Sequence, residues 1–331
     1  MPTSMQLLLL ALTTLYQAVA TVLEARQPPP GQFIHMGQHR LHFCVAGEAK
    51  IADKICPTIV LDHSLGGIEG YLLMEDLAKL SRTCIYDRAG YGWSDHSPFP
   101  RTSEQIVQEL DQLLTTAQIE PPYLLIGDSF GSYNVRLYAH RFPQKVAGIV
   151  LTDGLHESEM LKMSVSLQAL KFFFISGFLM STLGSILGFI RLLENVGGFE
   201  LLKPELRPFS RESRDRIKRS FCRPKHWITM SREMINLEKS ARQMRVAEHL
   251  GAIPIVSIKA SSFFKPSIWS TFIPLRQANQ LRDRMHLKLC QLSTDCLQIE
   301  APESGHFVWV DQPEIIMRAI EILLEKIELE H

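Results

Sequence analysis

Short apolar runs alternate with longer helical patterns from residue 32 to the end of the chain, except between residues 157 and 251. This alternation is typical of βαβ units that build a mostly parallel sheet. The apolar runs predict eight strands, at residues 32–36, 39–46, 58–61, 83–86, 123–126, 147–151, 254–258 and 296–299, the first two joined as a hairpin. The intervening patterns predict helices at residues 71–80, 103–117 with Thr102 as the N-cap, 132–141 and 313–328. We therefore expect an α/β fold with an eight-stranded, mostly parallel sheet flanked by helices.

Residues 157–251 interrupt this rhythm, because they carry no strand pattern and read as helices, some of them very apolar. We expect them to form a helical lid, or cap, over the sheet. The chain of 331 residues then divides into an apolar anchor and linker (1–31), a core built from 32–156 and 252–331, and this lid.

The N-terminal segment 6–23 contains no charged residue over 18 positions, which is the lower end of the length that spans a membrane. The triplet at 18–20 resembles a signal-peptidase site, but the preceding residues contain no Lys or Arg. We expect an uncleaved membrane anchor, with a cleaved signal peptide or a buried soluble helix as the alternatives. Arg26 and Arg40 follow the segment, so the positive-inside rule places the catalytic domain on the cytoplasmic side.

A second uncharged stretch covers 19 residues, 172–190, and contains Gly184 and Gly188 in G-x-x-x-G spacing. Hydropathy alone predicts a membrane span here. A span at this position would place the two parts of the predicted core on opposite sides of the bilayer. We therefore expect an apolar lid element, either buried in protein or dipping into one leaflet.

The composition excludes several classes of function. Lys plus Arg and Asp plus Glu each number 35, with 46% apolar residues, so the chain is neither disordered nor globally attractive to nucleic acid. Six cysteines are scattered without a C-x-x-C pair, which argues against a zinc site or a disulfide framework. We expect no nucleic-acid partner and no metal or organic cofactor.

One stretch departs from this neutral balance. Residues 211–225 hold seven basic and two acidic side chains. A solvated helix face and a contact with anionic lipid headgroups are the two interpretations.

The strongest chemical signal is the segment 127–131, which reads Gly-Asp-Ser-Phe-Gly. This G-x-S-x-G pattern follows a predicted strand and precedes a predicted helix, the setting in which a serine is displayed on a sharp turn. Flanking glycines keep side chains out of that turn, and the helix N-terminus directs N–H groups toward an oxyanion. Ser129 is therefore the candidate nucleophile. Asp128 is disfavoured as a nucleophile, because Ile126 and Phe130 rather than glycines lie two residues from it.

A serine hydroxyl needs a histidine to take its proton, and an acid must orient that histidine. His306 lies in the loop between the last predicted strand and the final helix, at the sheet edge where Ser129 is expected. Asp153 follows the sixth predicted strand at the same edge and is the favoured acid. Asp283, in a charged helical segment, and Asp295, which precedes its strand, are the alternatives.

With these motifs in this order, residues 32–325 outside the lid resemble a serine hydrolase of the α/β-hydrolase fold, in its esterase, lipase and perhydrolase branch. The matching segments are 62–67, 86–94, 127–131 and 304–306. The resemblance implies a Ser-Asp-His triad and an oxyanion hole formed by the N–H groups of Leu65 and Phe130. The chain departs from the family in reading His-Ser-Leu-Gly-Gly instead of His-Gly-x-Gly, and Gly-Asp-Ser instead of Gly-His-Ser.

These residues predict acyl transfer to water. His306 would deprotonate Ser129, which attacks an ester carbonyl, and water would release the acid from the acyl-enzyme while Asp153 orients the imidazole. The apolar lid, the basic stretch and the anchor predict a lipophilic or lipid-derived ester taken from a membrane surface. The alternatives are an acyltransferase, a cofactor-free perhydrolase or a peptidase on the same triad, and a membrane-anchored binding module without turnover. Substrate, acyl-chain length and oligomeric state stay open.

Overall fold

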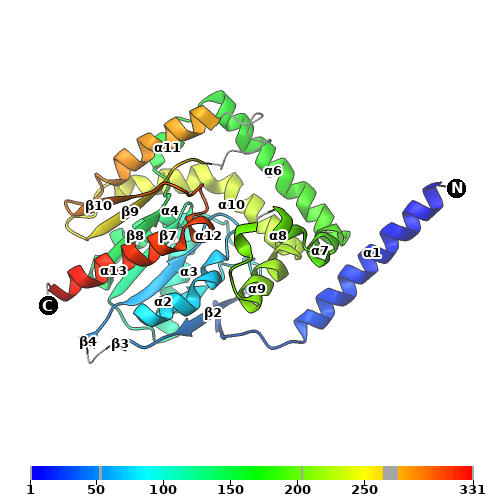
Figure 1. The fold of residues 1–331 in the computed structure, drawn as a ribbon, viewed down its shortest axis with the longest axis horizontal. Coiled ribbons are helices and arrows are strands. Elements are labelled where there is room, and N and C mark those ends of the chain that lie inside the picture. The colour runs from blue at the N-terminus through cyan, green and yellow to red at the C-terminus, as the bar shows by residue number, and fades with distance from the viewer. Residues whose placement is uncertain (1, 52–53, 203, 264–274, 330–331) are drawn as a thin grey trace.

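An eight-stranded sheet runs through the centre of the molecule in the order β1-β2-β6-β5-β7-β8-β9-β10 (Figure 1). The structure is a computed structural model that describes residues 2–51, 54–202, 204–263 and 275–329. The strands of this sheet are β1 (Gln32–His35), β2 (Arg40–Ala46), β5 (Thr58–Asp62), β6 (Thr83–Tyr86), β7 (Tyr123–Asp128), β8 (Val146–Thr152), β9 (Ile255–Ala260) and β10 (Cys296–Ala301). The β1/β2 and β2/β6 pairs are antiparallel and all other neighbours are parallel. The predicted eight-stranded, mostly parallel sheet is confirmed.

The strand boundaries differ from the predicted ones mainly at their carboxyl ends. β7 continues to Asp128, because Gly127 pairs with Leu151 and Asp128 with Thr152 on β8. Pairing needs only backbone groups, so an apolar pattern does not reveal these last two positions. The serine motif therefore begins inside the strand and not after it. A short hairpin, β3 (Lys50–Ile51) and β4 (Lys54–Ile55), was not predicted.

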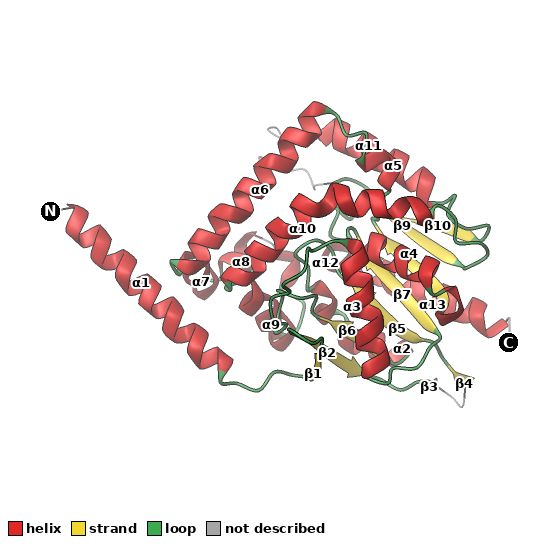
Figure 2. Cartoon of the chain, turned by 180° about the vertical axis from the view of Figure 1, so that it is seen from behind, coloured by secondary structure: helices red, strands yellow, loops and turns green. Residues whose placement is uncertain are grey.

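Helices cover both faces of the sheet (Figure 2). They are α2 (Met74–Leu80), α3 (Ser103–Thr116), α4 (Gly131–Arg141) and α13 (Pro313–Leu329), with 3₁₀ turns at Glu69–Leu72 and Pro143–Lys145. Leu125 of β7 packs into the core that contains α3 and α4, whereas Leu124 and Ile126 pack into the core that contains α2 and α13. Since successive strand side chains alternate between faces, a strand buried on both faces is apolar throughout.

Between β8 and β9 the described residues form a run of helices, in agreement with the helical pattern of 157–251. They are α5 (Glu157–Met160), α6 (Val165–Ile186), α7 (Phe189–Asn195), α8 (Gly198–Leu202), α9 (Arg211–Phe221) and α10 (Pro224–Gln243), with 3₁₀ turns at Pro204–Leu206 and Met244–Ala247. The remaining helices are α1 (Pro2–Ala25), α11 (Leu275–Leu289) and α12 (Val308–Asp311). α6 packs along α10, which in turn contacts α3 of the core.

The contact between α10 and α3 replaces a predicted helix cap. Thr102 occupies the N-cap position of α3, but its side chain makes no capping hydrogen bond. Ser240 Oγ of α10 accepts from the Ser103 N–H at 3.0 Å, and Gln243 Oε1 accepts from the Glu104 N–H at 3.1 Å. The orphan N–H groups of α3 are thus satisfied from another helix, which a local sequence pattern does not predict.

Two helices of the described residues are long and apolar enough to cross a membrane, one over Ser4–Ala25 and the other over Val165–Ile186. In α6 the side chains of Phe172 and Phe173 are 66% and 70% exposed. The expectation that this helix could be buried in protein is therefore wrong for its outward face. Its insertion into one leaflet stays a prediction.

Several basic side chains of the stretch 211–225 form ion pairs within the protein. Lys218 pairs with Glu200 of α8 at 2.6 Å, and Arg223 pairs with Glu24 of α1 at 2.5 Å. The stretch is therefore not a fully solvated face, because acids of distant elements pair with several of its cations. A contact with anionic lipid headgroups stays a prediction.

The tight packing of α4 on β5 can be tested at Gly131. A Cβ atom there would lie 2.2 Å from the Asp62 carbonyl oxygen, whereas a Cβ atom at Gly177 of α6 meets nothing within 4 Å. We expect Gly131→Ala to lower the free energy of unfolding in urea by about 1–3 kcal/mol. Gly177→Ala should be neutral or stabilising by up to about 1 kcal/mol. Equal effects at the two glycines would contradict this account.

Candidate active site

Ser129 sits on a strained turn between β7 and α4. Its φ is +49°, an uncommon value for a residue with a side chain. Its N–H donates to the Thr152 carbonyl oxygen at 2.9 Å, which holds the turn at the carboxyl end of β8. A Cβ atom on Gly127 would lie 2.5 Å from Val135, so this neighbouring position excludes a side chain, as the motif predicts.

The residue before the serine lies deeper. Asp128 ends β7 and is 3% exposed. Ser129 and Phe130, by contrast, line a cavity. This burial agrees with the expectation that Asp128 is not the nucleophile.

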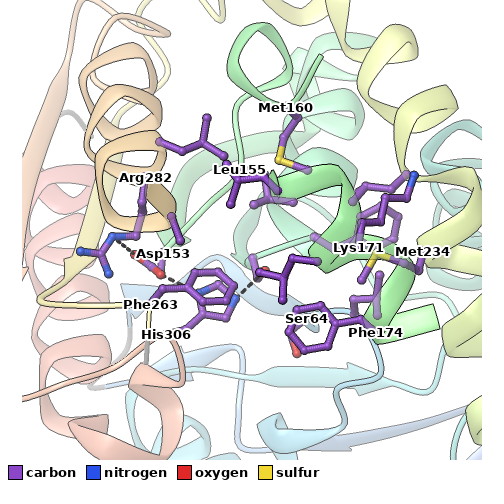
Figure 3. Close-up of a pocket in the computed structure, with 18 of the residues that line it drawn as sticks. Ser64, Asp153, Leu155, Met160, Lys171, Phe174, Met234, Phe263, Arg282 and His306 are labelled. Atoms are coloured by element: carbon purple, nitrogen blue, oxygen red, sulfur yellow. Dashed lines mark hydrogen bonds and ion pairs between the residues drawn. The ribbon is translucent and has the colours of Figure 1, made fainter. Parts of the chain in front are cut away.

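The structure brings Ser129, His306 and Asp153 together, and Figure 3 shows Asp153 beside His306. The Ser129 Oγ lies 2.9 Å from His306 Nε2, and His306 Nδ1 lies 2.5 Å from Asp153 Oδ2. With Nδ1–H donating to the carboxylate, Nε2 is free to accept the proton of the serine hydroxyl. The ring of His306 stacks on Phe263, with ring centroids 4.8 Å apart.

The second oxygen of Asp153 is also occupied. Asp153 Oδ1 accepts from His286 Nε2 at 3.0 Å and from the Ala260 N–H at 3.3 Å, and Arg282 Nε lies 3.7 Å away. Burial alone would raise the pKa of Asp153, but the hydrogen bonds from His286 and His306 outweigh it and hold the pKa well below its usual range. The carboxyl is therefore an anion at neutral pH.

The sequence pattern did not single out His286 or Arg282. Both lie on α11, four residues apart, and both are buried. Residues at this spacing share one face of a helix, here the face that also carries Leu281, Met285 and Leu289. A cationic or imidazole side chain on an apolar helix face is the signal that could have found them.

The two alternative acids lie elsewhere. Asp283 is half-exposed on α11 and pairs with Lys259 at 3.3 Å. Asp295 precedes β10 and pairs with Lys326. Among the three candidate acids only Asp153 contacts His306.

The cavity beside Ser129 holds about 280 Å³ and is strongly apolar. Figure 3 shows Asp153 and His306 on one side of it, with Phe174 and Met234 opposite. The apolar lining comes mainly from the insertion and from α11, for example Leu167, Phe174 and Phe178 of α6, Met230 and Met234 of α10, and Met285 of α11. Within the described ranges, no group of three or more His, Cys, Asp or Glu side chains could hold a metal ion.

Arg88 holds the loop that follows β5. Its Nη2 donates to the Ser64 carbonyl oxygen at 2.7 Å. Because the Ser64–Leu65 peptide is trans and planar, the Leu65 N–H points away from Arg88. Leu65 and Phe130 both line the cavity, and neither N–H donates a backbone hydrogen bond within the described part of the chain. Both stay candidate oxyanion donors.

Arg88 itself is fixed by two buried carboxylates. Its guanidinium pairs with Asp62 of β5 at 2.7 Å and with Glu233 of α10 at 2.9 Å, and it is 1% exposed. Tyr91 also donates to Glu233, at 2.8 Å. The loop beside the cavity is thus tied to the insertion.

Comparison with known proteins identifies the family. A family model described as "alpha/beta hydrolase fold" matches residues 57–311. This chain belongs to the α/β-hydrolase family. The AB hydrolase superfamily protein of Gibberella zeae is 24% identical to this α/β hydrolase over 273 residues, which cover 75% of the chain and 80% of that protein.

Other relatives match over shorter stretches. YqjL of Bacillus subtilis is 40% identical over 81 residues, 24% of this α/β hydrolase and 32% of YqjL, so the match spans about a third of that relative. The mouse (lyso)-N-acylphosphatidylethanolamine lipase is 30% identical over 101 residues, 29% of each chain.

Solved structures share the fold of this α/β hydrolase. Cfl2 from Burkholderia cenocepacia aligns with a TM-score of 0.66 and 19% identity over 88% of this chain and 95% of its own. The enol-lactonase from Burkholderia xenovorans aligns with a TM-score of 0.59 and 16% identity over 89% and 100%. At these identities the likeness is one of fold alone.

The buried ion pairs of this α/β hydrolase can be tested at Arg88. Arg88→Met leaves Asp62 and Glu233 as buried, uncompensated carboxylates, and we expect the free energy of unfolding to fall by about 3–5 kcal/mol. Adding Glu233→Leu should restore part of the loss in a double-mutant cycle. The control, Arg40→Met, breaks a half-exposed pair with Asp95 and should cost about 1 kcal/mol or less. A comparable loss in both single variants would refute the distinction.

Proposed function

We propose that this protein is a serine hydrolase that cleaves a lipophilic carboxylic ester through an acyl-enzyme intermediate. The observation that carries the proposal is the hydrogen-bonded series Ser129–His306–Asp153, with separations of 2.9 and 2.5 Å, at the wall of an apolar cavity. Membership of a hydrolase family supports hydrolysis, and the geometry supports a serine nucleophile.

In the proposed first half-reaction, His306 Nε2 takes the hydroxyl proton while the Ser129 oxygen bonds to the ester carbonyl carbon. The carbonyl oxygen becomes an oxyanion, which accepts hydrogen bonds from the Leu65 and Phe130 N–H groups. The tetrahedral intermediate then collapses, the bond to the alkoxy oxygen breaks, and His306 gives its proton to the leaving alcohol.

In the second half-reaction, water replaces the alcohol. His306 removes a proton from water as the water oxygen attacks the acyl carbon, and the serine oxygen leaves with that proton. Asp153 stays ionised throughout because of its depressed pKa, so it stabilises the imidazolium and fixes the Nδ1–H tautomer. No metal or organic cofactor takes part in these steps.

The cavity supports a lipophilic acyl group as substrate. Most of the lining residues are Leu, Met and Phe, and Met side chains adapt to flexible chains. The mouse relative is by name a lipase on a phospholipid derivative, which agrees with such a substrate.

We also infer that the insertion acts as a lid over the cavity and that α1 associates the protein with a membrane, with the catalytic domain on the cytoplasmic side.

The nucleophile can be tested with Ser129→Ala. This variant should lose fluorophosphonate labelling and lower the hydrolysis of p-nitrophenyl esters by about 10⁴-fold or more, with an unchanged melting temperature. Ser166→Ala, an exposed serine on α6, is the matched control. For the wild type, kcat/KM should rise from butyrate to octanoate and longer esters. Persistent labelling of Ser129→Ala would remove this serine from the mechanism, and a preference for peptide or short acyl substrates would refute the lipophilic ester.

The acid can be tested by comparing two variants. Asp153→Asn should lower kcat by about 10⁴-fold, because the amide no longer selects the Nδ1–H tautomer of His306. Asp283→Asn should leave kcat within about twofold, because it only breaks an exposed pair with Lys259. Steady-state kinetics with a short ester measures both. Loss of turnover in the second variant alone would overturn the assignment of Asp153.

A further inference from the structure

In α1 the polar side chains point inward and the apolar ones outward, which is the reverse of a helix on the surface of a soluble protein. Its inward positions follow one helix face, and the polar ones among them are Thr13, Thr14, Gln17, Thr21 and Glu24. Most of its outward positions are apolar, and eight of them are 49–67% exposed, namely Leu7, Leu8, Leu9, Leu12, Leu15, Val19, Val22 and Leu23. A helix in contact with water has its apolar face inward. The outward face of α1 is therefore suited to lipid.

The inward polar groups attach α1 firmly to the insertion. Gln17 Nε2 donates to the Cys222 carbonyl oxygen at 2.7 Å, and Gln17 Oε1 accepts from Arg191 Nε at 2.7 Å. Gln17 is 4% exposed, so both bonds are shielded from water. The middle of α1 is thus bound at one defined position on the helices that follow α6. We call this contact, together with the ion pairs of Glu24, the seat of α1.

Glu24 adds a cluster of ion pairs at the end of α1. It pairs with Arg191 of α7 and with Arg223, the residue before α10, and Arg219 of α9 lies 3.9 Å away. One carboxylate therefore holds three guanidinium groups together. Its removal would leave these three cations adjacent and half-buried or more.

The apolar surface of α1 continues onto the insertion. The turn between α6 and α7 touches α1 so closely that a Cβ atom on Gly188 would lie 2.4 Å from the Thr13 carbonyl oxygen. Outward side chains that are 39–70% exposed follow along α6 and α7, namely Phe172, Phe173, Leu179, Met180, Leu183, Ile186, Phe189 and Leu192. Together with the outward positions of α1, these residues form what we call the outer apolar face.

Figure 1 shows how the two helices are arranged. α1 and α6 meet at α7 and run at a steep angle to each other, and the N-terminal end of α1 extends beyond the rest of the molecule. Residues 4–9 of α1 are exposed, and Leu10 is the first residue of the helix that is partly buried. The 22-residue apolar segment of α1 is about 33 Å long, close to the roughly 30 Å of a bilayer core.

We propose that the outer apolar face is embedded in one lipid bilayer, with α1 crossing it and the outward faces of α6 and α7 lying in the leaflet next to the core. The exposed N-terminal turns of α1 cross the far leaflet, and the part of α1 that is bonded to the insertion lies beside α7 in the near leaflet. α6 itself does not cross, because a crossing would separate Ser129 from His306, which are hydrogen-bonded.

This placement also assigns the source of the substrate, a step that depends on the proposed function. The inward face of α6 lines the cavity through Leu167, Phe174 and Phe178, while its outward face contacts lipid. One helix thus separates the cavity from the leaflet. A lipophilic ester dissolved in that leaflet reaches Ser129 past α6 without entering water.

Depth-dependent quenching tests the embedding without any need for turnover. The full chain, with Cys290→Ser and Cys296→Ser, receives one bimane label at Met180→Cys, Leu8→Cys or, as control, Gln112→Cys on α3. In vesicles containing brominated phosphatidylcholine, we expect quenching at 180 and at 8 but not at 112. Quenching at 8 alone would overturn the embedding of α6. Absence of quenching at 180 together with a dimer in solution would instead assign the face to a second copy of the chain.

The seat of α1 is tested with Glu24→Gln, matched by Glu248→Gln at an exposed position. The rate on a long-chain ester presented in vesicles should fall by about tenfold in Glu24→Gln, because the three arginines lose their common anion. The rate on water-soluble p-nitrophenyl butyrate should not change. An equal loss on both esters, or none, would refute the role of the seat. A wild type inactive on both esters would refute the proposed function but leave the quenching result standing.

Discussion

One buried carboxylate connects the parts of this molecule that come from distant places in the chain. Asp153 leaves β8 with a φ of +40°, and its N–H donates to the Ile258 carbonyl oxygen of β9. Its two oxygens then bind His306 from the last loop and His286 from α11. The anion can stay buried only because these partners stabilise it. The position of the His306 ring, and so its distance to Ser129, follows from that arrangement.

A second buried charge joins the insertion to the core. Arg88 binds the loop after β5 through the Ser64 carbonyl oxygen, and Glu233 of α10 binds Arg88 through both of its oxygens. α10 also caps α3 through Ser240. These contacts hold α10 against the core and against the loop at the cavity wall, because breaking any one of them leaves a buried polar group without its partner.

On the outer apolar face the usual distribution is reversed, because apolar side chains are exposed there and polar side chains are buried. A soluble protein rarely leaves a large contiguous apolar face in water. The apolar side chains of α1 and α6 nevertheless point outward, while Gln17 and Glu24 of α1 bind the insertion. Within the basic stretch 211–225, Arg223 pairs with Glu24 of α1, and Arg214 and Lys218 pair with Glu200 of α8. The inward polar groups and the outward apolar groups of α1 occur together, and this arrangement is the basis of the proposed lipid contact on this side of the protein.

The sequence by itself determined the sheet, the helices around it and the candidates Ser129 and His306, with Asp153 as the favoured acid, because strand periodicity and the G-x-S-x-G turn are local, and the carboxyl ends of parallel strands share one edge. It could not determine the partners of those residues. His286, Arg88 and the caps on α3 act through contacts between segments more than 20 positions apart, and no local pattern records such contacts. The direction in which an apolar helix faces is likewise decided only when its neighbours are in place. Only the tertiary structure showed which of the three acids binds His306. It also showed that the polar face of α1 points inward and that Arg223 of the basic stretch pairs with Glu24.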